Sequence, residues 1–77
     1  MSILGVIVRT RPADRPAVAA ELRALPGTDV ALEADDGRLI LVLEDAEDAP
    51  AADTLARIAL WPRVLNTSLV YETSEIS

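Results

Sequence analysis

The order of short apolar runs along the chain is the feature that most constrains its fold. A run rich in β-branched residues at 3–8 is followed by an amphipathic segment with helical spacing, which ends at Pro26-Gly27. A second apolar run at 39–43 is also followed by an amphipathic segment, and a last apolar run occupies 64–71. The pattern therefore predicts that each half of the chain begins with a strand followed by a helix, and that the chain has a further strand at 64–71.

A tight turn is predicted where the two halves meet. The half-apolar residues 30–32 and the run at 39–43 flank Asp35-Asp36-Gly37. Asp-Gly between two β-prone runs indicates a hairpin, because glycine accepts the positive φ that such turns require. Two βαβ units joined by a hairpin predict a ferredoxin-like α+β plait, in which a four-stranded antiparallel sheet in the order 4-1-3-2 carries both helices on one face. We expect one domain over residues 1–77.

Composition excludes much of the usual chemistry of active sites. The chain has no Cys and no His, and its 13 acidic residues outnumber 7 basic ones, all of them Arg. Without thiols or imidazoles we expect no catalytic residues, no metal site and no cofactor. The net charge of −6 argues against nucleic-acid binding and favours a basic partner. No apolar run is long enough for a membrane span or a signal sequence, so we expect a cytoplasmic location without membrane insertion.

One face of the predicted sheet has no helix to cover it. Such a face should alternate apolar and polar residues, but the runs at 3–8 and 39–43 are apolar at nearly every position. A two-residue turn at Asp36-Gly37 pairs Asp35 with Arg38 and sorts the strand residues into two faces. The residues predicted to face the core are Leu4, Val6, Val8, Val30, Leu32, Ala34, Leu39, Leu41, Leu43, Leu65, Thr67, Leu69 and Tyr71.

The opposite face, here called the open face, is predicted to be largely apolar. Its apolar members are Ile3, Ile7, Ile40, Val42 and Val70, with Gly5 and Ser68 as a floor and Glu33, Glu44, Arg9 and Asn66 as a rim. The strand periodicity also assigns Asp29, Ala31 and Val64 to this face. Contiguous apolar surface on a small domain is typical of an interface. We predict that a protein or peptide binds there. Self-association through the same face is the main alternative, and a buried ligand site is the third.

The acidic residues near this face have two interpretations. Glu33 and Glu44 are predicted either to contact a basic partner or to be ordinary surface charges. The acids before the second amphipathic segment suit the positive end of a helix dipole, and for them this structural role is favoured. These acids are Asp45, Glu47 and Asp48. Further acids near the rim that are candidates for contact with a basic partner are Asp35, Asp36 and Asp45.

Arginines follow the first predicted strand, at Arg9, Arg11 and Arg15. Small plait enzymes of the acylphosphatase type hold an anion at this place, but with a glycine-rich loop, where this chain has prolines. We therefore do not predict an anion site. Trp61 is expected to cap the junction between the second helix and the last strand.

Several short motifs together resemble the NapD family over nearly the whole chain. They are Leu25-Pro26-Gly27, Asp29-Val30-Ala31, Gly37-x-Leu39-Ile40, the run to Glu44 with Glu47-Asp48, and Val64-Leu65-x-x-Ser68-Leu69-Val70-Tyr71. The chain departs from the family at Arg63, where a glycine is usual, and at Glu72, where a histidine is common. The hairpin is also about one residue shorter.

The resemblance implies a cytoplasmic chaperone for maturation of the periplasmic nitrate reductase. Such a chaperone binds the twin-arginine signal peptide of the catalytic subunit as a helix against the sheet, and it delays export until the molybdenum cofactor is inserted. The expected signal-peptide-binding residues are Ile3, Gly5, Ile7, Ile40, Val42, Ser68, Val70, Glu33 and Glu44. We expect a monomer or weak homodimer. The alternative function is a dimeric effector-binding regulatory domain that associates through its sheet face.

Overall fold

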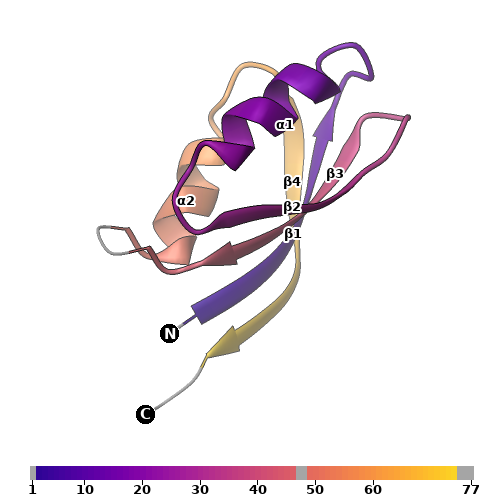
Figure 1. The fold of residues 1–77 in the computed structure, drawn as a ribbon. Helices are drawn as coiled ribbons and strands as arrows, with labels where there is room; N and C mark the ends of the chain where they lie inside the picture. Colours follow the sequence, from indigo (N-terminus) through magenta and orange to yellow (C-terminus); the bar gives the residue numbers. More distant parts are fainter. Residues whose placement is uncertain (1, 47–48, 75–77) are drawn as a thin grey trace.

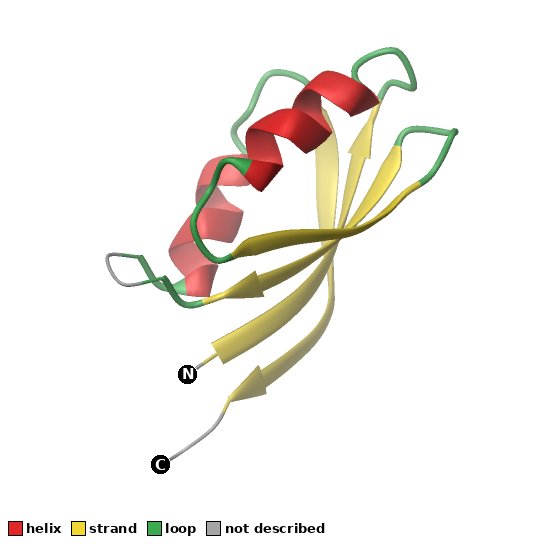
Figure 2. Ribbon diagram, viewed as in Figure 1, coloured by secondary structure: helices red, strands yellow, loops and turns green. Residues whose placement is uncertain are grey.

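The computed structural model describes residues 2–46 and 49–74 and has six regular elements. They are β1 (Ser2–Thr10), α1 (Arg15–Arg23), β2 (Thr28–Glu33), β3 (Arg38–Glu44), α2 (Ala51–Ile58) and β4 (Val64–Ser74). The strands form one antiparallel sheet in the order β2-β3-β1-β4. Both helices lie on the same face of this sheet (Figures 1 and 2). The predicted ferredoxin-like plait with strand order 4-1-3-2 is therefore confirmed.

The core lies between the two central strands and the helices. Alternate residues of β1 and β3 point toward the helices, where they meet apolar side chains of α1 and α2. The buried residues of the central strands are Leu4, Val6, Val8, Leu39, Leu41 and Leu43, and those of the helices include Val18, Ala19, Leu22, Ala51 and Ile58. The predicted face assignment of the two central strands is correct. Consequently their other residues point to the open face.

The loop between β3 and α2 is fixed by the carboxylate of Asp45. Pro50 precedes α2 in an extended conformation and offers no side-chain cap. The Asp45 carboxylate instead accepts hydrogen bonds from the backbone N–H of Ala51 at 2.8 Å and of Ser2 at 2.9 Å. It therefore ties the first residue of α2 to the start of β1, in agreement with the helix N-terminal role predicted for it. Glu47 and Asp48, predicted to share that role, lie outside the described residues.

Replacing Asp45 with alanine should lower the melting temperature at neutral pH, because two N–H groups lose their acceptor. Hydrogen bonds from Ala51 and Ser2 lower the pKa of Asp45 below its ordinary value of 3.8. A carboxyl group with a pKa lowered by folding stabilises the folded state above its unfolded pKa, and this contribution is lost as the pH falls through the folded value. Thermal melts of the two proteins should therefore converge as the pH falls well below 3.8. A difference that is constant from neutral to acidic pH would contradict this role.

The turn between β2 and β3 is one residue longer than predicted. Ala34 N–H donates to Arg38 O at 2.8 Å and Gly37 N–H donates to Ala34 O at 3.1 Å, so the loop has three residues, Asp35 to Gly37. Gly37 has φ 98°, as expected for the residue that ends such a loop. The predicted pairing of Asp35 with Arg38 is therefore wrong.

This one-residue difference moves β2 side chains to the other face of the sheet. Leu32 is opposite Ile40 and Glu33 is opposite Leu39, so Leu32 lies on the open face and Glu33 on the helix side. A bulge between Val30 and Leu32 then restores Val30 to the helix side, opposite Leu41. The predicted core positions of Leu32 and Ala34 and the predicted open-face position of Glu33 are wrong. Val30 was assigned correctly.

Strand β4 contains two irregularities that also change its faces. The register between β1 and β4 shifts at Val70, and beyond this shift Tyr71 is opposite Gly5 on the open face. Tyr71 was predicted to lie in the core, and that prediction is wrong. Val70, predicted on the open face, is the extra residue of the bulge and has no cross-strand partner.

The first irregularity in β4, at Leu65, lets Val64 enter the core, whereas it was predicted on the open face. Leu69 faces the helix side, opposite Val6, but it is 52% exposed because the helices pack mainly over β1, β2 and β3. Leu65 is also exposed. Strand β4 thus carries apolar side chains that neither α1 nor α2 covers. None of the helices formed by the described residues has the length and apolar character required to cross a membrane.

Candidate peptide-binding face

Side chains from all four strands form one continuous apolar surface on the open face. Ile40 lies between Leu32 and Ile7 in one cross-strand row, and Val42 shares the next row with Gly5 and Tyr71. We call this surface the apolar band. Its members are Ile3, Ile7, Leu32, Ile40, Val42 and Tyr71. Leu32, Ile40 and Tyr71 are 52%, 37% and 47% exposed, so the band is a solvated surface rather than part of the core.

Gly5 and Tyr71 form a close contact at one side of the band. A Cβ atom placed on Gly5 would collide with the Tyr71 ring, which lies directly against the glycine backbone. The ring covers Gly5, so that this glycine is buried although it belongs to the open face. Glycine inside a strand often marks the close approach of another group. The glycine inside the apolar run 3–8 was therefore a sequence signal from which a close contact at Gly5 could have been predicted.

A small hollow lies beside the middle of the apolar band. Its walls are Ile7, Leu32, Ala34, Arg38 and Ile40, and its volume is about 90 Å³. Four of these five side chains are apolar, so the hollow suits an apolar side chain of a bound partner. Because Leu32 and Ala34 reach it only through the three-residue turn, the sequence did not predict it.

Opposite charges lie at the two ends of the band. At one end, Asp29 is opposite Val42 and Glu44 is opposite Ile3, and a notch of about 260 Å³ lies between these acids. At the other end, Arg9 and Arg38 are directly opposite each other on β1 and β3. Asp29 was predicted to lie on this face, but it was not included among the expected signal-peptide-binding residues.

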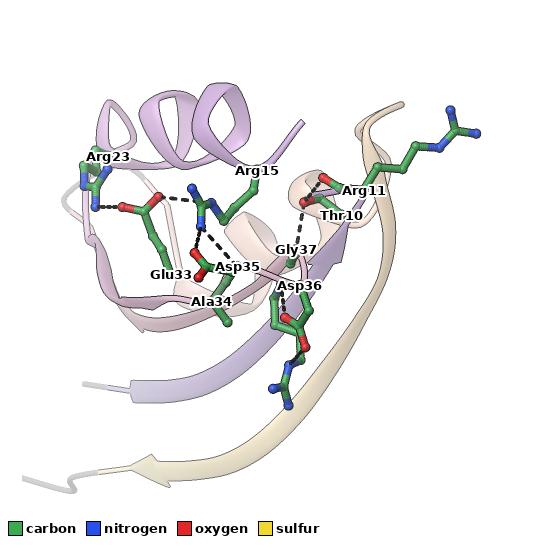
Figure 3. Close-up of polar contacts among 10 residues, drawn as sticks. Thr10, Arg11, Arg15, Arg23, Glu33, Ala34, Asp35, Asp36 and Gly37 are labelled. Carbon is green, nitrogen blue, oxygen red and sulfur yellow. Dashed lines mark hydrogen bonds and ion pairs between the residues drawn. The ribbon is translucent and has the colours of Figure 1, made fainter. Parts of the chain in front are cut away.

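Glu33 does not belong to this face, contrary to the prediction. Figure 3 shows its carboxylate between two arginines of α1, with Arg23 at 2.6 Å and Arg15 at 3.7 Å. The hydrogen bond from Arg23 and the positive charges of both arginines lower the pKa of Glu33. Arg15 also donates to Ala34 O at 3.2 Å and to Asp35 at 3.3 Å. Glu33 therefore joins β2 to α1 on the helix side.

The structure brings together most of the residues predicted for the site. Those found on the open face are Ile3, Gly5, Ile7, Ile40, Val42, Ser68 and Glu44. Glu33 is on the opposite side, and Val70 is in a bulge. Leu32 and Tyr71 are present on the open face but were predicted to face the core.

A second concave surface lies on the helix side, between the end of α1 and α2. It has a volume of about 410 Å³, and its lining includes Leu25, Pro26, Arg57 and Trp61. Trp61 is half-buried and packs against the core, as expected for a cap at the helix–strand junction. The lining includes no carboxylate, and among the described residues no group of three or more acidic side chains is placed to hold a metal ion.

Comparisons with known proteins place the chain in a family. A search of curated proteins finds no match. The solution structure of the E. coli Tat proofreading chaperone protein NapD is similar, with a TM-score of 0.80 and 27% sequence identity, over 95% of this chain and 78% of that chain. A family model described as NapD protein matches residues 1–76. Since this match covers nearly the whole chain, the protein belongs to the NapD family.

Proposed function

We propose that this protein is a cytoplasmic chaperone without enzymatic activity that binds the twin-arginine signal peptide of the periplasmic nitrate reductase catalytic subunit. By holding that peptide it would delay export until the molybdenum cofactor is inserted. Family membership and the likeness to a Tat proofreading chaperone support the chaperone role. The observation that carries peptide binding is the apolar band, which lies on the sheet face opposite α1 and α2.

The width of the apolar band suits a single bound helix. Neighbouring strands are about 4.8 Å apart, so the outermost strands of the sheet are separated by about 14 Å. A helix with its side chains is about 10 Å across. Laid along β1 and β3, it would contact Ile7, Ile40 and Val42 beneath it, with Leu32 and Tyr71 on either side. The band therefore has the shape that an apolar helix face needs.

Apolar contact would supply most of the affinity. A signal peptide that orders on binding and buries about 600 Å² of apolar surface gains roughly 15 kcal/mol at about 25 cal/mol per Å². Association and ordering of the peptide remove much of this gain, which leaves an affinity in the micromolar to nanomolar range. Such an affinity allows the peptide to be held during maturation and then released to the export machinery.

The proposal is tested by titrating ¹⁵N-labelled protein with a synthetic twin-arginine signal peptide. Amide shifts should concentrate in β1 and β3 and at Leu32 and Tyr71, while α1 and the exposed face of α2 stay unchanged. A peptide of equal charge, with its apolar residues replaced by serine, is the matched control and should cause no such shifts. Unchanged spectra at about 300 μM signal peptide would reject the proposal, since micromolar binding saturates well below that concentration.

Sedimentation of the free protein separates this function from the alternative. A chaperone that keeps its open face available should sediment as a monomer or a weak dimer. The regulatory-domain alternative instead requires a tight dimer that buries the apolar band. A tight dimer with no affinity for the signal peptide would therefore favour the alternative.

A further inference from the structure

We propose that the signal peptide lies on the open face in one direction, with its arginine head at Asp29 and Glu44 and its carboxyl-terminal end at Arg9 and Arg38. This inference rests on the proposed function, because it takes the peptide as the occupant of the apolar band. It adds a direction of binding and assigns a role to both charged ends of the band.

The carboxylates at the acidic end are available to a partner. Asp29 and Glu44 are both exposed, and neither forms an ion pair or side-chain hydrogen bond within residues 2–46 and 49–74. Glu72 of β4 also lacks an ion pair within the described residues, but it is opposite Leu4 and therefore lies on the helix side. Three further acids near the sheet are already engaged. Glu33 pairs with Arg15 and Arg23, Asp36 with Arg38, and Asp45 with two backbone N–H groups. A pair of guanidinium groups would therefore find its free partners at Asp29 and Glu44.

The opposite end of the band carries an excess of positive charge. Arg9 and Arg38 are cross-strand partners, and like charges placed directly opposite each other are unfavourable. Asp36 bonds Arg38 at 2.8 Å, while Arg9 has no ion-pair partner in the described part of the chain. A negative group of a partner would relieve this repulsion. The unpaired carbonyl groups at the end of a helix, where the dipole is negative, are such a group.

The distance between the two ends matches a helix that covers the band. Arg38 and Glu44 are the first and last residues of β3, and six residue steps along a strand span about 20 Å. At 1.5 Å per residue, a helix of about 13 residues has the same length. A bound helix of this length brings one terminus to each charged end, so its direction decides which charges meet.

Two electrostatic terms then favour the same direction. The arginine head and the positive amino-terminal end of the helix both meet Asp29 and Glu44, while the negative carboxyl-terminal end meets Arg9 and Arg38. In the reversed direction, the arginine head would face Arg9 and Arg38, and the helix carbonyl groups would face two carboxylates. Apolar contact with the band is similar in both directions, so charge decides between them.

Paramagnetic relaxation measures the direction. Two signal peptides are prepared, one with a nitroxide label beside the arginine pair and one with the label at the carboxyl-terminal end. We expect the first label to broaden the amides of Asp29 and Glu44, and the second to broaden those of Arg9 and Arg38. The opposite pattern, or equal broadening at both ends, overturns the inference but leaves peptide binding intact. Absence of binding overturns the proposed function as well.

Matched charge changes test the acidic end separately. Asp29→Asn combined with Glu44→Gln should weaken binding of the Arg-Arg peptide about tenfold and leave a Gln-Gln peptide nearly unaffected. The control variant, Glu21→Gln with Asp53→Asn, makes the same change in net charge on the helices. Equal weakening by the control would show that only the overall negative charge matters, and it would overturn the specific role of Asp29 and Glu44.

Discussion

Replacing Gly37 with alanine should lower the free energy of unfolding by about 3 kcal/mol, which is a large part of the stability of a chain this short. Gly37 has φ 98°, where an L-residue is strained. A Cβ at this position would also collide with Thr10 O and lie 3.1 Å from Pro12 N. Both neighbours are backbone atoms, so they cannot rotate away as a side chain would.

The surroundings of Gly37 leave little room for adjustment. Its carbonyl oxygen accepts the N–H of Thr10 at 2.9 Å and lies 3.0 Å from the Thr10 hydroxyl, which is buried. Figure 3 shows Gly37 and Thr10 joined in this way where the hairpin meets the end of β1. Any shift of the turn therefore strains these bonds as well. Urea unfolding followed by circular dichroism measures the effect.

Gly5→Ala is the control for Gly37→Ala, since it makes the same chemical change in the same sheet. The three atoms nearest to the added methyl group at Gly5 all belong to the Tyr71 ring, which is a half-exposed side chain of an edge strand and can swing aside. We expect the free energy of unfolding to change by less than about 1 kcal/mol. Equal losses for the two variants would contradict the explanation from positive φ and backbone collision.

Replacing Ile40 with aspartate should weaken binding of the signal peptide at least about 30-fold, because a central contact of an interface is worth about 2 kcal/mol or more. Ile40 lies in the middle of the apolar band, between Leu32 and Ile7, and forms a wall of the small hollow. A carboxylate there would have to be desolvated under the bound helix. Isothermal titration calorimetry with the synthetic peptide measures the change.

Leu69→Asp is the matched control for Ile40→Asp. Leu69 is also an exposed apolar residue of the sheet, but it is opposite Val6 and therefore lies on the helix side. The control should bind the peptide as the wild type does. Ile40→Thr retains a β-branched side chain and should still weaken binding, which keeps the test valid if Ile40→Asp is unstable. Unchanged affinity in both Ile40 variants would show that the peptide binds elsewhere.

The fold and the faces of the central strands could be predicted because the relevant signals are local and repeated. In β1 and β3, helix-side and open-face positions alternate without interruption, and the antiparallel register follows that alternation. The strand order then follows from two βαβ units and the connection rules of a sheet. Periodicity therefore predicts four of the six members of the apolar band, Ile3, Ile7, Ile40 and Val42.

The predicted side-chain faces are wrong where one extra residue, in a turn or a bulge, changes the register of a strand. The three-residue turn at Gly37 places Leu32 and Glu33 on the faces opposite to those predicted, and the bulge before Leu32 returns Val30 to the core. The bulge at Val70 moves Tyr71 in the same manner. A bulge depends on the packing of both strands and has no strong sequence signature, so periodicity alone assigns the residues beyond it to the wrong face.

The charged ends of the band were also only partly predictable. Glu44 was placed correctly, because it is the last residue of β3 and no bulge interrupts that strand's pairing with β1, whereas Glu33 was placed on the wrong side of the sheet. Its true partners, Arg15 and Arg23, belong to α1, and a pairing between helix and strand cannot be derived from the pattern of either element alone. Charge at a rim is thus less predictable than apolar alternation.

The position of Tyr71 over Gly5 gives the protein two separate optical reporters. The chain has one tyrosine and one tryptophan. Tyr71 lies on the open face, whereas Trp61 packs against the core beside the helices on the other side. The intrinsic fluorescence of Tyr71 therefore monitors occupancy of the sheet surface, while that of Trp61 monitors the integrity of the fold. Binding and unfolding are consequently distinguishable in a single unlabelled sample.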